Sequence, residues 1–373
     1  MKIAVYYDGV LGGGSRAIEE ILKILSTRHH IEIFNGPKPF TLPPFFQRIF
    51  VDFESLVSQY FKQKTLAKKI DSQKFDLVFV SHDFHPHAPW ILRFLKTPSV
   101  FLCQEPTRAF YEKYLGIESA LPLLNKIYEN VNRFLRRRIE ESNVRFANKV
   151  VTSSYCSAES IFRAYGVSSA VAYPGIDPLV YRQIKNKKKK QILIVGNHDL
   201  QKDLPFAIKA VSLIDKKIRP RLIIVSPRKA NVSDLKKLAK LKHVDVTFFV
   251  GLDKNEMCKL YNQSLLTIAT AHLEAFGLSI IESLACGTPV VAIKEAGFRE
   301  TIVDCKTGLL VDRNNQQMAN AIEELLKDKK KREDMGKRGI KDVNTRYTWD
   351  NTVEKLEKIF YETKKDKSSR RHC

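Results

Sequence analysis

Two carboxylates near the start of a predicted helix are the residues of this chain best suited to hold a ligand. In the stretch "HLEAFGLSIIESLACGTPVV", Glu274 precedes the helix and Glu282 lies about one turn inside it. The preceding run "LLTIAT" is typical of a strand, and we expect the helix to begin around Gly277–Ser279. The amides of Gly277 and Leu278 would then face a bound anion, and the carboxylates would accept hydrogen bonds from vicinal hydroxyls. The stretch predicts a site for a sugar phosphate or a nucleotide.

A purely structural interpretation of these residues is also open. Ser279 and Glu282 have the spacing of a capping box, in which Glu282 would only reach back to an amide at the helix start. Glu274 would then be a solvated loop acid. The "FG" between the two carboxylates and the "ACGTPVV" after them favour the ligand site.

A glycine loop near the start of the chain offers a second phosphate site. Gly12 to Ala17 spell G-x-G-x-x-A, as in dinucleotide-binding folds. However, the predicted strand Ile3–Tyr7 is followed by "DGVL" before the first glycine, and the next strand ends at Asn35 rather than at an acidic residue. An oxidoreductase that uses the Gly12 loop therefore stays an alternative hypothesis.

A histidine-rich loop follows the apolar run "DLVFVS". It contains His82, Asp83, His85 and His87. Zinc sites use such residues, but they place them at regular spacing on an element and add a fourth ligand. We expect no metal, and we interpret the loop as lining a cleft.

Short β-branched runs alternate with helical stretches along the whole chain. They form two series, separated near residues 173–190 by "YPGIDPLVYR" and a lysine run. This pattern predicts an α/β protein with two doubly wound Rossmann-like domains. We expect domains at 1–174 and 175–345, a helix at 346–365 that packs back on the first domain, and a disordered basic tail at 366–373. Ligands in such folds sit at the carboxyl ends of the strands, here in the cleft between the domains.

The chain is strongly basic. It has 63 Lys and Arg against 41 Asp and Glu, a net charge of +22. This suggests a polyanionic neighbour: nucleic acid, an anionic membrane or a phosphorylated substrate. No nucleic-acid motif is present, so we expect no nucleic-acid partner. The six cysteines occur singly, with no C-x-x-C pair, and we see no signal peptide or spanning apolar run. We therefore expect a cytoplasmic protein, soluble or peripheral on the inner face of the membrane.

The carboxylate stretch resembles the E-x7-E signature of the retaining glycosyltransferases with a GT-B fold, in the glycosyltransferase group 1 family. The resemblance covers nearly the whole chain. Its further segments are "YPGIDPLVY", "VGNHDLQKD", "KTGLLVD", "EAGFRE" and the opening "GGGSRAIEEILKIL".

By this resemblance we expect a retaining hexosyltransferase that moves a sugar from a nucleotide-sugar donor to an acceptor hydroxyl, with a lipid-linked or cell-envelope glycan as the candidate acceptor. The resemblance implies that Glu282 holds the ribose hydroxyls, Glu274 the transferred sugar, and Lys202 the diphosphate. The backbone of Phe276, Gly277 and Leu278 would face the phosphate and sugar. Gly12 and Gly13 occupy the family's paired glycine positions, so their amides would approach the donor or the acceptor. No D-x-D pair occurs, so no metal or other cofactor is expected.

Two positions depart from the family pattern. Asn197 stands where the family has a diphosphate-binding arginine, so charge neutralisation should depend more on Lys202. Gln104 stands where a cleft histidine is common, and we favour His82 as its substitute in catalysis. The base, the sugar and the acceptor are not readable from the sequence.

A basic amphipathic segment suggests an anionic membrane as a partner. "NKIYENVNRFLRRRIEESNVRF" carries apolar residues at helical spacing: Ile127, Val131, Phe134, Leu135 and Ile139. Its basic residues are Lys126, Arg133, Arg136, Arg137 and Arg138. The stretch "FTLPPFFQRIFVDF" adds aromatic residues. In the alternative interpretation, the apolar residues face the domain core and the arginines face water.

Overall fold

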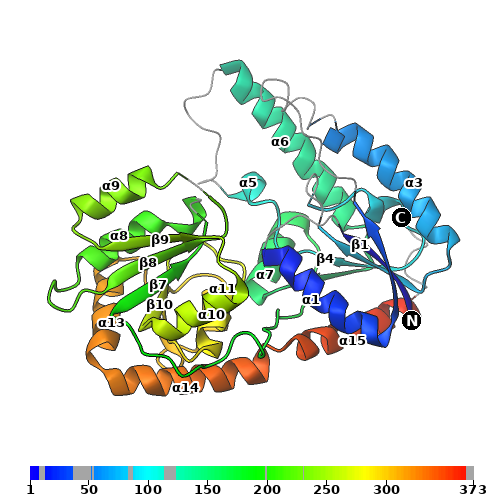
Figure 1. Ribbon diagram of the computed structural model, residues 1–373. Coiled ribbons are helices and arrows are strands. Elements are labelled where there is room, and N and C mark those ends of the chain that lie inside the picture. The colour runs from blue at the N-terminus through cyan, green and yellow to red at the C-terminus, as the bar shows by residue number, and fades with distance from the viewer. Residues whose placement is uncertain are drawn as a thin grey trace. The chain divides into compact units, whose positions relative to one another are not determined.

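The structure is a computed structural model that describes residues 1–7, 13–36, 52, 54–82, 87–112, 123–197, 200–229 and 231–366 (Figure 1). The chain divides into two compact units. The first comprises Met1–Tyr173 and Thr352–Cys373, and the second comprises Pro174–Asn351. The border between residues 173 and 174 lies one residue before the one expected from the sequence.

The first unit is built on a six-stranded sheet with the order β2-β1-β3-β4-β5-β6, in which all neighbours are parallel. Its strands are β1 (Lys2–Tyr7), β2 (His30–Asn35), β3 (Leu77–Ser81), β4 (Ser99–Leu102), β5 (Lys149–Thr152) and β6 (Ala170–Val171). Its helical segments are α1 (Gly13–Arg28), the π-helical turn η1 (Glu54–Ser58), α3 (Gln59–Ser72), α4 (Ile91–Phe94), α5 (Arg108–Tyr111), α6 (Leu123–Val144), α7 (Tyr155–Tyr165) and most of α15 (Trp349–Lys365). The strand order reverses between β1 and β3, so a ligand of this sheet is expected at the carboxyl ends of these two strands.

The apolar runs of the sequence form these strands because both faces of a parallel sheet are covered by helices. Ile3, Val5 and Phe79 have no exposed surface. The helices begin and end at recognisable caps. The Ser154 hydroxyl accepts a hydrogen bond from the amide of Ser157 at the start of α7, and Gly166 ends that helix at a φ of 69°.

Helix α15 belongs mainly to the first unit, although it follows the second unit in the sequence. The ring of Phe360 lies 5.2 Å from that of Phe79 in β3. The carboxylate of Glu357 accepts from Arg28 at 2.9 Å, and Lys364 pairs with Asp76 at 2.8 Å. These contacts attach the carboxy-terminal helix to the first sheet.

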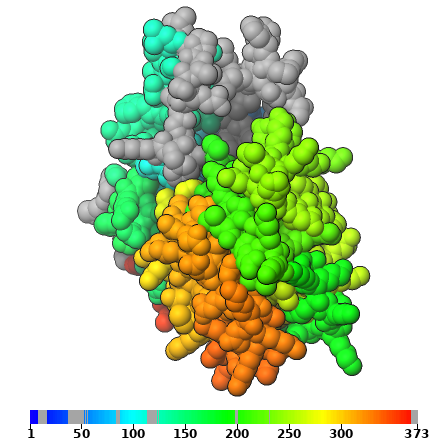
Figure 2. Space-filling view, turned by 90° about the vertical axis from the view of Figure 1, so that its left-hand side faces the viewer, coloured from blue at the N-terminus to red at the C-terminus, as the bar shows by residue number. Residues whose placement is uncertain are grey.

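The second unit repeats the architecture with the order β12-β11-β10-β7-β8-β9, again with parallel neighbours. Its strands are β7 (Gln191–Val195), β8 (Arg221–Ser226), β9 (Val246–Val250), β10 (Leu266–Ala269), β11 (Val290–Ile293) and β12 (Gly308–Val311). Its helices are the 3₁₀ turn η3 (Leu200–Lys202), α8 (Leu204–Ser212), α9 (Ser233–Leu241), α10 (Lys254–Gln263), α11 (Leu278–Ala285), α12 (Phe298–Thr301), α13 (Asn315–Lys327) and α14 (Lys329–Arg346). In Figure 2, α13 and α14 (orange) form one continuous part of the surface of this unit.

The strand order of the second sheet reverses between β7 and β10. In open parallel sheets, ligands bind where loops diverge from the carboxyl ends of two such strands, so a ligand of this sheet is expected there. The loop after β7 leads to Asn197 and Lys202, and the loop after β10 carries Glu274. The predicted site residues of the second unit thus lie at its topological switch point.

Candidate active site

Lys202 and Glu274 meet at the switch point of the second sheet. The Lys202 Nζ forms an ion pair with the Glu274 Oε2, and their side chains are 25% and 18% exposed. The backbone between them is also connected. The Thr270 hydroxyl donates to the Lys202 carbonyl at 2.8 Å, and the His272 amide donates to the Gln201 carbonyl at 2.7 Å. The two loops therefore hold an ammonium and a carboxylate side by side.

Helix α11 begins where the sequence predicts, but its cap differs. The N-cap is Gly277 at a φ of 91°, and no side chain caps the helix. A Cβ at Gly277 would lie 3.0 Å from the Phe298 ring, so the left-handed turn also needs a residue without a side chain. The alternative interpretation, in which Ser279 and Glu282 form a capping box, is therefore wrong. The Ile280 amide donates to the Gly277 carbonyl at 2.9 Å, whereas the geometry of an α-helix gives the amides of Leu278 and Ser279 no intrahelical acceptor, which suits an anion.

Glu282 faces helix α10. Its exposed fraction is 9%, and its Oε2 accepts a hydrogen bond from the Tyr261 hydroxyl at 2.8 Å. Burial, and then the charge of Glu282, hold the pKa of Tyr261 well above its usual value. Tyr261 thus stays protonated and orients the carboxylate. Sequence reasoning missed Tyr261 because nothing in its own segment distinguishes it from a core residue.

The backbone around Glu274 is held by a second glycine turn. The amide of Gly297, in the predicted "EAGFRE" segment, donates to the Glu274 carbonyl at 2.8 Å. A Cβ at Gly297 would lie 2.5 Å from the Ala275 carbonyl oxygen, so only glycine allows this approach. The side chain of Phe276 is 4% exposed and packs 5.6 Å from the Tyr347 ring. The buried side chain is therefore not available to a ligand, and only the backbone of Phe276 stays a candidate contact.

Asn197 lies just after β7, at the position of the missing arginine. Its Oδ1 is buried and makes no hydrogen bond within the described part of the chain. The neighbouring Gly196 packs closely on the aliphatic part of the Lys202 side chain: a Cβ at position 196 would lie 2.9 Å from the Lys202 Cγ. An unsatisfied amide beside Lys202 is suited to a polar ligand.

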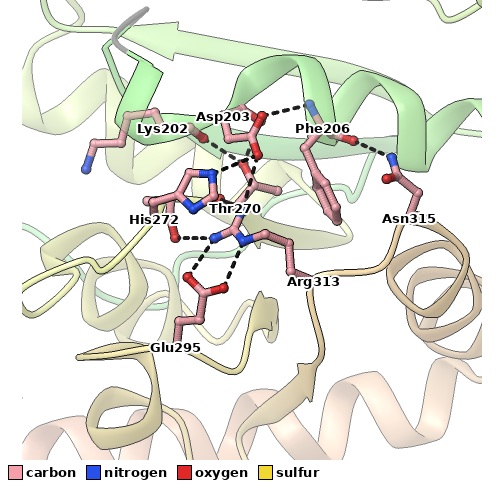
Figure 3. Close-up of polar contacts among 9 residues, drawn as sticks. Lys202, Asp203, Phe206, Thr270, His272, Glu295, Arg313 and Asn315 are labelled. Carbon is pink, nitrogen blue, oxygen red and sulfur yellow. Dashed lines mark hydrogen bonds and ion pairs between the residues drawn. The ribbon is translucent and has the colours of Figure 1, made fainter. Parts of the chain in front are cut away.

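Arg313 is a residue of this region that the sequence analysis missed. It lies two positions after β12, at the same carboxyl edge, and its guanidinium contacts Asp203, Glu295 and the backbone at Thr270 and Ala271 (Figure 3). The available signal was a cation two positions after the strand "GLLV". Burial alone would raise the pKa of Glu295, but the hydrogen bonds and charge of Arg313 lower it below its usual value.

The first unit places His82 at its own switch point, directly after β3. Its ring centroid lies 5.9 Å from that of His87, and its Nδ1 lies 3.4 Å from the Ser81 hydroxyl. Burial and the charge of His87 lower the pKa of His82 to about 4. His82 is therefore neutral near pH 7, which suits a hydrogen-bonding role.

Other first-unit predictions are only partly described. Gly12, Asp83 and His85 lie outside the described residues, and Gly13 begins α1. Among the residues that the structure describes, no group of three His, Cys, Asp or Glu side chains is arranged to hold a metal ion. The carbonyl of Gln104 accepts from the Thr152 hydroxyl at 3.2 Å.

Comparison with known families identifies both units. Residues 11–179 match the family model described as Glycosyltransferase Family 4, and residues 180–342 match the model described as Glycosyl transferases group 1. The chain belongs to the group 1 glycosyltransferases. The predicted family and the GT-B fold, with two doubly wound domains, are confirmed.

Solved structures support the fold of this glycosyltransferase. It is similar to the sucrose-phosphate synthase of Thermosynechococcus elongatus, with a TM-score of 0.75 and 18% identity over 97% of this chain and 98% of that one. It is also similar to Anabaena HepE in complex with UDP-glucose, with a TM-score of 0.74 and 17% identity over 97% and 100% of the two chains.

Curated relatives of this glycosyltransferase differ in their substrates. It is 29% identical over 245 residues to the D-inositol 3-phosphate glycosyltransferase of Acidothermus cellulolyticus, covering 59% of this chain and 54% of that protein. It is 24% identical over 388 residues to the N-acetyl-alpha-D-glucosaminyl L-malate synthase of Bacillus anthracis, covering 98% of each. The chain spans about half the length of the first curated relatives that it matches. Within the described residues of this glycosyltransferase, no helix has the length and apolarity needed to cross a bilayer.

Proposed function

We propose that this glycosyltransferase takes its sugar from a nucleotide-sugar donor held at the switch point of the second sheet. The observation that carries the proposal is the meeting of Lys202, Glu274 and the start of α11 at this edge. Lys202 and the helix amides would neutralise the diphosphate as charge builds up on the leaving group. Glu274 would accept hydrogen bonds from the transferred sugar. Glu282, oriented by Tyr261, would accept them from the ribose.

The proposal assigns charge neutralisation to protein groups. Asn197 would complete the pocket, since its amide can donate to a phosphate oxygen when it is rotated and can accept from a hydroxyl as it stands. Lys202 would then be the cation of the diphosphate site, and no metal is assigned to it. For the donor, UDP-glucose is the first candidate to test, because a similar structure is described in complex with it.

The reaction would proceed with retention of the anomeric configuration. In this mechanism the bond between the anomeric carbon and the diphosphate oxygen breaks while the acceptor oxygen forms its bond on the same face. The acceptor proton passes to the departing phosphate oxygen. Neutral His82 would hold a hydroxyl of the sugar or the acceptor by a hydrogen bond.

The acceptor side of the proposal rests on helix α6. This helix presents apolar residues to solvent and buries polar ones: Val131 and Phe134 are 54% and 56% exposed, whereas Asn132 and Glu140 are 6% and 1% exposed. Ile127 and Leu135 are exposed as well, so the interpretation that these residues face the domain core is wrong. An exposed apolar stripe of this kind is typical of an interaction surface.

Buried polar contacts explain this inverted orientation. Asp52 accepts hydrogen bonds from the Tyr128 hydroxyl at 2.6 Å and from the Asn132 Nδ2 at 2.7 Å. Glu140 accepts from the Thr107 hydroxyl at 2.8 Å and from the Tyr165 hydroxyl at 3.1 Å. Asp52 and Glu140 are therefore paired with this side of the first unit, although the buried Oδ1 atoms of Asn132 and Asn143 on α6 make no hydrogen bond within the described residues.

Basic side chains flank the exposed stripe. Arg137 and Arg138 are 47% and 67% exposed. Apolar residues together with arginines match an anionic membrane surface, where the former enter the headgroup region and the latter contact phosphates. We therefore propose a lipid-linked or other glycolipid acceptor, and peripheral attachment to the inner face of the membrane. The second expected segment, "FTLPPFFQRIFVDF", lies outside the described residues except for Asp52.

The donor part of the proposal is tested by thermal stabilisation. The protein is mixed with UDP-, GDP- and ADP-sugars and, separately, with NADH. One of the nucleotide sugars should raise the melting temperature, and NMR of the transfer product should show the anomeric configuration of the donor. Stabilisation by NADH alone would favour the oxidoreductase alternative, and an inverted product would exclude retention.

A further inference from the structure

The Arg313 side chain uses all of its hydrogen-bond donors within the second unit. Nε donates to the Glu295 Oε1 at 2.8 Å, and one terminal nitrogen donates to the Glu295 Oε2 at 2.8 Å and to the Ala271 carbonyl at 3.1 Å. The other donates to the Asp203 Oδ2 at 3.1 Å and to the Thr270 carbonyl at 3.0 Å. A guanidinium has five N–H groups, so none is left for a phosphate.

These five bonds connect three separate loops, which converge on the guanidinium in Figure 3. Asp203 directly follows Lys202, and Ala271 lies three residues before Glu274. Glu295 lies two residues before Gly297, whose amide holds the Glu274 carbonyl. Arg313 thereby fixes the backbone on both sides of the Lys202–Glu274 ion pair.

Each of the three loops contains a residue in the left-handed region. Asp203, Leu273 and Ala296 have φ angles of 47°, 45° and 43°, and none is a glycine. Side chains rarely adopt this conformation, and it persists where the surrounding contacts require it. All three residues are either a partner of Arg313 or within two positions of one. The guanidinium of Arg313 is one group that all three loops contact.

Further contacts stabilise the arrangement around Asp203. Its Oδ1 accepts from the Phe206 amide at 3.3 Å and so caps α8, and its Oδ2 also lies 3.3 Å from the His272 Nε2. The Phe206 ring lies 5.8 Å from the guanidinium, and the Asn315 Nδ2 donates to the Phe206 carbonyl at 3.3 Å. Arg313 is thus held from several directions, and its side chain is 21% exposed.

We propose that Arg313 is a positioning residue for the donor site. It sets the loops that carry Lys202 and Glu274 and does not touch the donor itself. The inference rests on the proposed function for the identity of the ligand, whereas the ordering of the loops does not depend on it. Lysine would keep the charge but offers three donors without the planar fork, so it cannot replace Arg313 here.

The test compares Arg313→Lys with a matched control, Arg219→Lys. Arg219 lies in the same unit at the amino edge of β8, and it also bridges backbone carbonyls, those of Ile214 and His243 among them. Hydrogen exchange of the free proteins is measured at the amides of His272 and Gly297, which donate to Gln201 and Glu274. We expect exchange about tenfold faster or more in Arg313→Lys, with no change in Arg219→Lys.

Binding of nucleotide sugars gives the second measurement. UDP-glucose, GDP-mannose and ADP-glucose are titrated into each protein, together with the nucleoside of whichever sugar binds the wild type. Arg313→Lys should weaken binding of the nucleotide sugar about tenfold or more and leave binding of the nucleoside within about twofold of the wild type. In turnover assays the loss should appear mainly as a raised KM. Glu295→Gln, which keeps the side-chain volume, should show the same selective loss to a smaller extent.

The possible failures are distinguishable. Unchanged exchange in Arg313→Lys, or equal weakening of nucleoside and nucleotide sugar, overturns the inference. A wild-type protein that binds none of the three sugars counts against the proposed function, and in that case faster exchange in Arg313→Lys alone still supports the ordering role of Arg313.

Discussion

Lys202 and Glu274 are 72 residues apart in the sequence, yet their ammonium and carboxylate groups are in direct contact. The proposed function assigns one to the diphosphate and the other to the sugar. The ion pair fixes both groups at the same edge of the second sheet and compensates their charges. Binding of a nucleotide sugar would exchange this contact for two contacts with the donor.

Replacing Lys202 with alanine should affect the phosphate part of the donor. Because Asn197 supplies no charge, Lys202→Ala should weaken binding of the nucleoside diphosphate by about tenfold or more and leave the bare nucleoside nearly unchanged. Titration calorimetry with both ligands measures this. Lys209→Ala, an exposed lysine on α8, is the control. Equal weakening of both ligands would place Lys202 outside the phosphate site.

Glu274→Gln should abolish transfer with little effect on stability. The substitution removes the charge that pairs with Lys202, and a partly exposed ion pair contributes about 1 kcal/mol or less to the free energy of unfolding. Turnover and melting temperature are measured on the same preparation. Near wild-type turnover would refute the role of Glu274, and a large loss of stability would show that the residue is mainly structural.

Glu282 and Tyr261 should behave as a coupled pair. Glu282→Ala removes the partner of a buried hydroxyl, so it should cost about 1–3 kcal/mol of stability and also abolish donor binding. Tyr261→Phe should cost less stability but raise the KM for the donor, because the carboxylate loses its orienting bond. A double-mutant cycle checks the coupling. Additive losses in the two single variants would indicate that the hydrogen bond has no role in binding.

The strands and the two-domain organisation were predictable because buried parallel strands are short continuous apolar runs. Runs such as "QILIVG" and "LLTIAT" correspond to β7 and β10, whereas the two-residue β6 carries too little pattern to be recognised. Glu274, Glu282 and Lys202 were predictable as candidates because a family motif marks them. Their ion pair and hydrogen bonds were not, since these join distant loops.

Three features depended on tertiary contacts that the sequence does not display. Arg313 contacts Asp203 from 110 residues away, so nothing local indicates the bond. Glu282 has capping-box spacing, but the left-handed turn at Gly277 starts the helix before Ser279. The amphipathic pattern of α6 predicted a helix correctly, but the buried partner Asp52 decides which side faces the domain.

His82 should make stability depend on pH. Its pKa is lowered to about 4 in the folded protein, whereas an unfolded histidine titrates near 6.5. Between these values the unfolded state binds more protons, so stability falls as the pH is lowered from about 6.5 toward 4. The contribution amounts to about 2 kcal/mol at pH 5.

The measurement is urea unfolding at several pH values for the wild type and for His82→Gln. The difference between the two proteins should change in this window and be constant above pH 7. His30→Gln serves as the control, since His30 is an exposed histidine of the same unit. Parallel pH profiles for wild type and His82→Gln would contradict the lowered pKa.

The last prediction concerns binding of α6 to anionic membranes. The protein should cosediment with vesicles that contain anionic lipid and remain in solution with neutral vesicles, and high salt should weaken the binding. Substitution of the exposed residues Val131 and Phe134 by serine should reduce binding without destabilising the fold, because neither contributes to the core. Arg138→Glu should reduce it further, since this arginine is 67% exposed.

Two features of the structure sharpen this experiment. Arg136 pairs with the buried Asp52 at 2.5 Å, so its replacement would disturb the packing of α6 and is avoided. Phe162→Ser is the control. Like Phe134, Phe162 is an exposed aromatic residue of the first unit, with 59% of its surface exposed, but it lies on α7. If the wild type stays in the supernatant with anionic vesicles at low salt, or if Phe162→Ser loses as much binding as the α6 variants, α6 is not the membrane surface. The acceptor is then better sought among soluble sugars.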